Sequence, residues 1–223
     1  MTTGTRRTAR RGDALSKRLI VEAAIEILDT GGEQALTFRA LAARLATGSG
    51  AIYHHVADKD DLLAAATDEV IARVMTEVAA GESPRATVRA IALGIFDAID
   101  AHPWIGAQLS RKPWQPAVIE ILEGMGGQLD ALGVPEPAQF DCASALVNYI
   151  LGLAGQYAAG ARLVTPDLDR SAFLATIATR WTTLDPEKYP FVRRMAAVLP
   201  THDDRDQFLA GIDLILNGMQ TLR

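Results

Sequence analysis

Apolar side chains recur at helical spacing along almost the whole chain, and this periodicity restricts the fold more than any other feature. The first clear example follows Ser16, where six apolar residues recur three and four positions apart: Leu19, Ile20, Ala23, Ala24, Ile27 and Leu28. Such spacing places the side chains on one face of an α-helix. No segment shows the apolar–polar alternation with a period of two that is typical of a half-buried strand. The sequence therefore predicts an all-α protein.

Composition excludes several other classes of protein. The chain has 223 residues, of which 49% are hydrophobic, enough for one large domain or a small module on a larger one. The single cysteine, Cys142, excludes an internal disulfide framework and a cysteine-rich zinc site. No run of about 18 apolar residues is present, so no membrane span is expected. The early arginines are not followed by an apolar stretch, so we expect no signal peptide and a cytoplasmic location.

Charge is distributed unevenly along the chain. Residues 1–59 contain nine Lys or Arg and six Asp or Glu, for a net charge of +3. The remaining residues contain 13 basic and 21 acidic side chains, for a net charge of −8. A basic N-terminal part joined to an acidic remainder indicates that only the N-terminal part meets a polyanion.

Turn and cap residues divide the N-terminal part into short helices. Gly31-Gly32 should end the helix that begins at Ser16, because glycine readily adopts the left-handed conformation that follows a helix. Thr37 is a favourable N-cap for a second helix. The remaining predicted features, in chain order, are a turn at Thr47-Gly48, a third helix from Ser49 to His55, and a fourth helix to about Ala79 that is capped by Asp58 and Asp61.

The rest of the chain also shows helical periodicity. Ser83-Pro84 has the order expected at a helix start, with an N-cap followed by proline at the first helical position. Further helical segments are predicted at about 84–100, irregularly between Pro103 and Pro113, and at 116–132, 137–160, 169–183 and 204–222, with a short helix after Pro190.

The segment LTFRALAARLATGSGAIYHHVADKDDLLAAATDEV (36–70) has the pattern of a helix-turn-helix. In this motif one helix enters the major groove of DNA while the other braces it on the phosphate backbone. The small residues Ser49, Gly50 and Ala51 would allow close approach to bases, and Tyr53, His54 and Lys59 can donate hydrogen bonds to phosphates. His54 and His55 are adjacent and point about 100° apart on a helix, so we expect no metal site there.

This segment resembles the TetR (tetracycline-repressor) family of bacterial regulators. The matching residues are Thr37, Arg39, Leu41-Ala42, Tyr53, His55-Val56, Lys59 and Leu62-Leu63. One departure is Ala46, where the family often has glycine. The resemblance implies an N-terminal three-helix DNA-binding domain at 13–60, after an arginine-rich disordered tail at 1–12, and a larger helical ligand-binding and dimerisation domain of about nine to ten helices at 61–223. It implies DNA contacts at Thr37, Arg39, Ser49, Gly50, Ala51, Tyr53, His54 and Lys59.

Three C-terminal stretches, 100–114, 145–156 and 206–220, also resemble the C-terminal domain of the tetracycline repressor. The resemblance implies a homodimer formed by the 137–160 and 204–222 helices, with interface residues Leu151, Gly155, Phe208, Ile212, Ile215 and Met219. It implies an effector pocket with candidate residues Phe96, His102, Trp104, Gln108, Met125, Asn148 and Tyr149. Gln108 and Gln156 stand where the tetracycline repressor has a His and a Glu that help to hold magnesium, so tetracycline–magnesium binding and metal cofactors are not expected.

The function expected from these features is that of a DNA-binding repressor that a small-molecule effector of unknown identity releases from a palindromic operator. An enzyme is one alternative, although the sequence has no G-x-S-x-G, H-E-x-x-H or phosphate-binding glycine loop and only His102 as a candidate. A helix-turn-helix protein that binds only a protein partner is another. Arg6, Arg7, Arg10 and Arg11 would either contact DNA as an arm or form a solvated tail.

Overall fold

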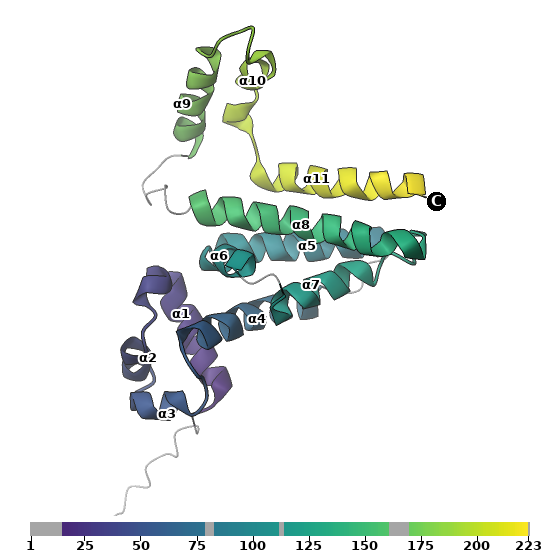
Figure 1. Ribbon diagram of the computed structural model, residues 1–223. Helices are drawn as coiled ribbons and strands as arrows, with labels where there is room; N and C mark the ends of the chain where they lie inside the picture. Colours follow the sequence, from purple (N-terminus) through teal and green to yellow (C-terminus); the bar gives the residue numbers. More distant parts are fainter. Residues whose placement is uncertain (1–14, 79–82, 112–113, 161–169, 223) are drawn as a thin grey trace, which may run out of the picture. The chain divides into compact units, whose positions relative to one another are not determined.

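The computed structural model describes residues 15–78, 83–111, 114–160 and 170–222 (Figure 1). Within these residues the chain forms eleven α-helices and two 3₁₀ turns and contains no β-strand, which confirms the predicted all-α class. Contacts divide the chain into two compact units, Met1–Glu69 and Val70–Arg223, which we call the head and the body. The predicted tail at 1–12, with its four arginines, lies outside the described residues. None of the described helices has the length and apolar character needed to cross a membrane.

The head contains three short helices and the beginning of a fourth. Their bounds are α1 Lys17–Ala35, α2 Phe38–Arg44, α3 Ser49–Tyr53 and α4 Lys59–Glu77, of which α4 continues into the body. Apolar side chains of these helices enclose a small core of Ile20, Ala24, Leu28, Leu41, Ile52, Leu62 and Leu63, all at most 2% exposed. Burial of this stripe, more than local propensity, holds such short helices in place.

Side chains cap α1, α2 and α4, and the caps of α2 and α4 are the ones that the sequence predicted. The Ser16 hydroxyl accepts from the Leu19 amide at 3.3 Å, and the Thr37 hydroxyl accepts from the Ala40 amide at 3.1 Å. At the start of α4, the Asp58 carboxylate accepts from the Asp61 amide at 2.8 Å. The Asp61 carboxylate reaches back to the Ala57 amide at 3.0 Å, so the predicted capping pair is confirmed.

Two turn residues adopt left-handed backbone conformations in the head. Gly32 has φ 67°, which breaks α1 at the predicted position, although one further helical turn follows to Ala35. Ala46 has φ 49° and is the only residue other than glycine with positive φ in the described chain. Gly48, in contrast, is extended, with φ −85°. The turn between α2 and α3 therefore places its left-handed residue at the position where the family often has glycine, and here an alanine carries the strain.

We predict that Ala46→Gly stabilises the head by about 1 kcal/mol, because glycine adopts this conformation without the clash of a Cβ. Chemical denaturation followed by circular dichroism measures the change. The matched control is Ala43→Gly, in the exposed face of α2, which should destabilise by about 0.5–1 kcal/mol. Destabilisation of similar size by both substitutions would contradict the strain at Ala46.

The body is built around α8. Its helices are the remainder of α4, then α5 Pro84–Ala101, α6 Trp104–Arg111, α7 Pro116–Gly126, α8 Glu136–Gly160, α9 Arg170–Thr182, α10 Pro190–Met195 and α11 Asp204–Met219, with the 3₁₀ turns η1 Leu199–Thr201 and η2 Gln220–Leu222. Figure 1 shows α8 lying along α5, α6, α7 and α11, whereas α9 and α10 extend away from this layer.

Local signals in the body are partly confirmed. Ser83 caps α5 through the Ala86 amide at 3.2 Å, with Pro84 in the first turn, as predicted. The helix predicted at 116–132 is wrong at its end, because α7 ends at Gly126 and Gly127 follows as its C-cap. After α7 the chain continues in tight turns, in which Gly133 has a left-handed conformation (φ 77°). Leu129 lies in these turns and is fully buried. The helix expected to be irregular after Pro103 is instead a regular helix, α6, over Trp104–Arg111.

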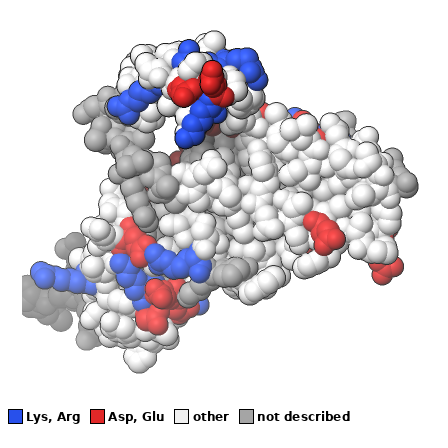
Figure 2. Space-filling model, turned by 45° about the horizontal axis from the view of Figure 1, so that its top comes forward, with Lys and Arg blue, Asp and Glu red and all other residues white. Residues whose placement is uncertain are grey.

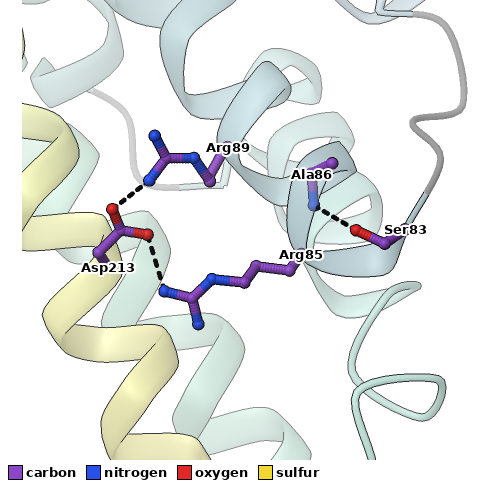
Figure 3. A network of polar contacts seen from close by, with 5 residues as sticks. All are labelled: Ser83, Arg85, Ala86, Arg89 and Asp213. Atoms are coloured by element: carbon purple, nitrogen blue, oxygen red, sulfur yellow. Dashed lines mark hydrogen bonds and ion pairs between the residues drawn. The ribbon is translucent and has the colours of Figure 1, made fainter.

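Ion pairs fasten α11 to α5 at two places. Asp213 of α11 accepts from Arg85 at 2.8 Å and from Arg89, both on α5 (Figure 3). Nearer the other end of these two helices, Arg205 of α11 binds Asp97 of α5 with two hydrogen bonds of 3.1 and 3.2 Å. The hydrogen bond from Arg89, with the charges of both arginines, lowers the pKa of Asp213 below its ordinary value of 3.8. The ionised form of Asp213 therefore stabilises the folded body.

We predict that Asp213→Asn lowers the free energy of unfolding near neutral pH by about 1–2 kcal/mol, since the carboxylate is only half-buried. Because the pKa is lowered in the folded state, the difference from wild type should persist above pH 3.8 and shrink as the pH falls through the lowered value. Urea denaturation between pH 3 and 7 measures it. Asp130→Asn, at an exposed position, is the control, and equal effects of the two substitutions would refute the role of Asp213.

Candidate nucleic-acid interface and effector pocket

The residues predicted to contact DNA lie together on α2, on α3 and at their ends. Six of the eight are exposed: Thr37, Arg39, Ser49, Gly50, Tyr53 and His54. Ala51 and Lys59 are half-buried. The Thr37 hydroxyl uses its oxygen to cap α2, which leaves its O–H available as a donor. His55, which the resemblance did not assign to DNA, is half-buried.

Contact with α2 positions Tyr53. Its ring stacks on Phe38 with centroids 4.2 Å apart and planes 8° apart, while 54% of the residue stays exposed. Such a stacked pair restricts the aromatic ring without burying it. The tyrosine can therefore present its hydroxyl from a fixed position at the end of α3.

The N-terminal end of α3 leaves open space. A Cβ placed on Gly48 or Gly50 would meet no atom within 4 Å. Packing inside the chain therefore does not require glycine at either position. Instead, these small residues leave no bulky side chain over the first turn of α3, so that a large molecule can approach its backbone amides.

Lys59 has an intramolecular role that the sequence did not reveal. Its ammonium donates to the main-chain carbonyl of Glu33 at 2.5 Å, across 26 residues of sequence. Glu33 follows the break at Gly32, so this bond ties the last turn of α1 to the start of α4. One of the three donors of Lys59 is thus engaged inside the head.

We predict that Lys59→Met destabilises the head by about 1 kcal/mol, because the substitution keeps an apolar stem but removes the charged donor to the Glu33 carbonyl. Thermal denaturation in the absence of DNA measures the loss. Lys17→Met is the control, since Lys17 is largely exposed and lies 4.0 Å from Asp61. If the two variants unfold at the same temperature, the bond has no structural role.

In the part of the body that the structure describes, the seven candidate pocket residues are divided between the buried core and two grooves. Phe96, Trp104, Gln108 and Met125 are buried, at 6, 8, 6 and 0% exposure. His102 borders a groove between α4 and α5, where its ring lies edge-on to Trp104 at 6.0 Å. Of the seven, only Asn148 and Tyr149 line a groove of about 950 Å³ that runs between α8, α11 and the end of α5.

Beside Tyr149, the groove is lined by Phe208 and Gly211, which the pocket prediction had not included. Tyr149 stacks on Phe208 with centroids 5.5 Å apart, and its hydroxyl donates to the Phe208 carbonyl at 3.3 Å. Burial raises the pKa of Tyr149 above its ordinary value of 10. Gly211 lies against the ring, where any Cβ would clash with it. Aromatic residues 59 positions apart gave no sequence signal of this contact.

The two glutamines that the resemblance aligned with magnesium-holding residues lie in different surroundings. Gln108 is buried, and its main-chain carbonyl accepts from the Gln115 side-chain amide at 3.0 Å. Gln156 lies on the exposed side of α8, at the groove. In the described part of the chain, no three His, Cys, Asp or Glu side chains gather as metal ligands would.

The six predicted dimer residues divide into three that are buried and three that are half-buried. Phe208, Ile212 and Met219 are at most 5% exposed and pack inside their own chain, so they have no surface to offer a second copy. Leu151, Gly155 and Ile215 are half-buried. The residue of α11 with the most exposed apolar surface is Leu214, at 71%. It lies in the groove beside Gly152 and Ala210.

Comparison with known proteins agrees with this arrangement. The family described as bacterial regulatory proteins, tetR family, matches residues 20–66, and the tetracyclin repressor-like C-terminal domain matches residues 79–223. The chain belongs to the TetR family. It is a DNA-binding transcriptional regulator with a helix-turn-helix head and a helical C-terminal body.

Individual relatives support the same assignment. The structure of the transcriptional regulator SCO7222, a TetR from Streptomyces coelicolor, is 52% identical, covers 94% of this chain and 99% of that one, and superposes with a TM-score of 0.83. An HTH-type transcriptional regulator of Saccharopolyspora erythraea is 33% identical over an aligned region that covers 62% of this chain and 59% of that relative. ActR from Streptomyces coelicolor in complex with actinorhodin is 23% identical, covers 94% of this chain and 97% of that one, and has a TM-score of 0.74. This last likeness shows the fold.

Proposed function

We propose that the protein is a homodimeric repressor that binds a palindromic double-stranded DNA operator and leaves it when a small-molecule effector binds the body. The observation that carries this proposal is the open, exposed start of α3 beside the braced helix α2. In a helix-turn-helix this geometry admits the second helix to the major groove. Residues 13–60 would be the DNA-binding domain and 61–223 the dimerisation and ligand-binding domain. Because its target is chromosomal DNA, we expect it to act in the cytoplasm.

The proposed DNA contacts separate into two kinds. Ser49, Gly50 and Ala51 would lie against base edges, where small residues allow close approach. Thr37, Arg39, Tyr53, His54 and the remaining donors of Lys59 would contact phosphates or the groove nearby. The stacking of Tyr53 on Phe38 supports this arrangement, since an exposed aromatic residue held in one orientation has no evident role within the chain.

We predict that Arg39→Gln weakens binding to an operator selected from a pool of random duplexes. It should also reduce the slope of log affinity against log salt concentration by about one, because the variant has one cation less with which to displace counterions from DNA. Fluorescence anisotropy between 50 and 200 mM salt measures both quantities. Arg111→Gln, an equal change of charge on the exposed side of α6, should leave the slope unchanged. A folded protein that shifts no DNA at low salt would favour a regulator that binds only a protein partner.

The proposed dimer surface is the outward face of α8 and α11. The exposed small residues Ala145 and Gly152 lie about two turns apart on α8, and the exposed Ala210 and Leu214 lie about one turn apart on α11. Figure 2 shows few charged groups on the body to the right of the view. Small residues let helices approach closely, and an exposed leucine on an uncharged face is typical of an interface between copies. Leu151, Gly155 and Ile215 would border this surface.

We predict that Leu214→Glu converts the dimer to a monomer at micromolar concentration, because the substitution introduces a charge at the centre of the interface without changing a buried side chain. Sedimentation equilibrium measures the shift in dissociation constant, at least about tenfold. Ile119→Glu, at another exposed apolar position, on α7, is the control. Equal association of both variants would place the interface elsewhere.

The effector would bind in the body, and α4 would transmit its effect. The buried cluster around Phe96, Trp104, Gln108 and Met125 supplies apolar surface with an amide, which suits a mostly apolar ligand with some polar groups. That ActR has been solved with actinorhodin supports a ligand of this kind. Since α4 is one continuous helix shared by both units, a ligand that favours one position of α4 would change the head. An effector that tightens DNA binding would contradict release.

An enzymatic function finds less support. His102 was the one candidate, and it lies in a groove edged by Arg73, Glu77 and Asp97, of which Asp97 is already bound by Arg205. The relatives are named as transcriptional regulators. We therefore propose that the groove at His102 has no catalytic role; turnover abolished by His102→Ala in a folded dimer would overturn this.

A further inference from the structure

The C-terminal end of α4, residues 72–77, lies at the surface of the body. None of these residues is buried, whereas Val70 and Ile71 just before them are 5 and 0% exposed. A groove of about 580 Å³ runs between this end of α4 and α5, and another of about 520 Å³ lies where Met75 meets α7. The end of α4 is therefore bordered by open space and is held by half-buried side chains.

Two glycines receive these side chains, one from each neighbouring helix. Val74 lies against Gly94 of α5, where a Cβ would come within 2.7 Å of Val74 Cγ1. Met75 lies against Gly124 of α7, where a Cβ would overlap the end of the Met75 side chain. Glycine inside a helix is destabilising relative to alanine. Each of these positions therefore loses helix stability but permits a close approach of α4.

The two contacts differ in stiffness. Valine branches at Cβ and keeps one strongly preferred rotamer in a helix, so Val74 cannot turn away from a larger residue. Its Cβ also lies close, at 3.9 Å from the Cβ position of residue 94. The atom nearest Gly124 is instead the terminal methyl of Met75, which can swing aside about three rotatable bonds. The contact at Gly94 thus fixes the distance between α4 and α5, whereas the contact at Gly124 adapts.

We propose that Gly94 is a positioning residue for operator binding, because it admits Val74 and thereby fixes the place of α4 on the body. The proposal rests on the proposed function, in which α4 connects the body to the DNA-binding head as one continuous helix. A methyl group at residue 94 must push the C-terminal end of α4 away from α5, and the grooves beside α4 leave room for this shift.

The head must follow such a shift, because the start of α4 is tied to it. The Lys59 ammonium binds the Glu33 carbonyl at the end of α1, and Asp58 and Asp61 cap the first turn of α4. A helix with regular hydrogen bonds transmits displacement of one end to the other more readily than it bends. Gly94 therefore acts on DNA through α4, without contact to DNA.

The first test measures the affinity of the full-length variant Gly94→Ala for the operator selected from random duplexes. Binding should weaken by roughly three- to thirtyfold, the range in which substitutions remote from both ligands alter a coupled site. Gly124→Ala is the matched control, since the Met75 methyl can swing aside. Gly126→Ala is a second control, since a Cβ there would lie 3.9 Å from that of Ala143. Both controls should bind within about twofold of wild type.

The double variant Val74→Ala, Gly94→Ala separates positioning from stability. It removes the methyl groups that the new Cβ meets, so operator affinity should return to within about threefold of wild type. A loss of stability alone predicts the opposite order, because the double variant also loses apolar contacts. Three results overturn the proposal: wild-type affinity of Gly94→Ala, no recovery in the double variant, or loss of the helical circular dichroism signal of Gly94→Ala. A wild-type chain that selects no duplex overturns the proposed function as well.

The second test uses the unaltered chain. Coupling between two sites is reciprocal, so if the Val74–Gly94 contact affects operator binding, the operator must stabilise that contact. Amide hydrogen exchange in residues 72–77 should therefore slow by about threefold or more when the selected duplex is added. The helix α9, which packs on α10 and η1, is the internal control and should not change. Unchanged exchange in residues 72–77, or equal slowing of both segments, overturns the proposal.

Discussion

The body depends on the burial of one long helix, α8, against four others. Its apolar side chains Ala143, Leu146, Ile150 and Ala154 are at most 4% exposed and face α5, α6, α7 and α11. Each fully buried leucine or isoleucine contributes roughly 1.5–3 kcal/mol relative to an exposed one, which far exceeds any single ion pair on the surface. Because α8 is occupied on so many sides, one face stays outward, and in its middle part that face carries the small residues Ala145 and Gly152. The proposed dimer surface is a consequence of this packing.

The ion pairs between α5 and α11 orient α11 within this packed body but are not the main source of its stability. Asp213 and Arg205 fasten α11 at two places, so that Phe208, Ile212 and Leu216 point into the core and Leu214 points outward. A shift of α11 by one residue would turn its surface by about 100° about the helix axis, so that the buried and the outward side chains would change places. The same helix therefore contributes to the core, to the floor of the groove and to the proposed interface.

Local signals allowed much of the fold to be predicted, because they act over a few residues. Thr37 and Ser83 were predicted as helix N-caps, and each accepts the expected amide. The end of α7 was not predicted, since Gly126-Gly127 ends a helix whose apolar periodicity continues to Leu129. The role of Lys59 could not be read from the sequence either, because its partner is a main-chain carbonyl 26 residues away. The wide apolar stripe of α11 was assigned to a partner, whereas most of it packs within the chain; sequence periodicity shows that a face is buried but not against which chain.

Two copies joined through α8 and α11 would carry two heads, and this two-fold arrangement is the central claim. Selection of bound duplexes from a random pool, followed by measurement of the number of chains per duplex by sedimentation, tests it most directly. A two-fold dimer must recover an inverted repeat and place two chains on each duplex. Recovery of an unrepeated site bound by one chain would contradict it.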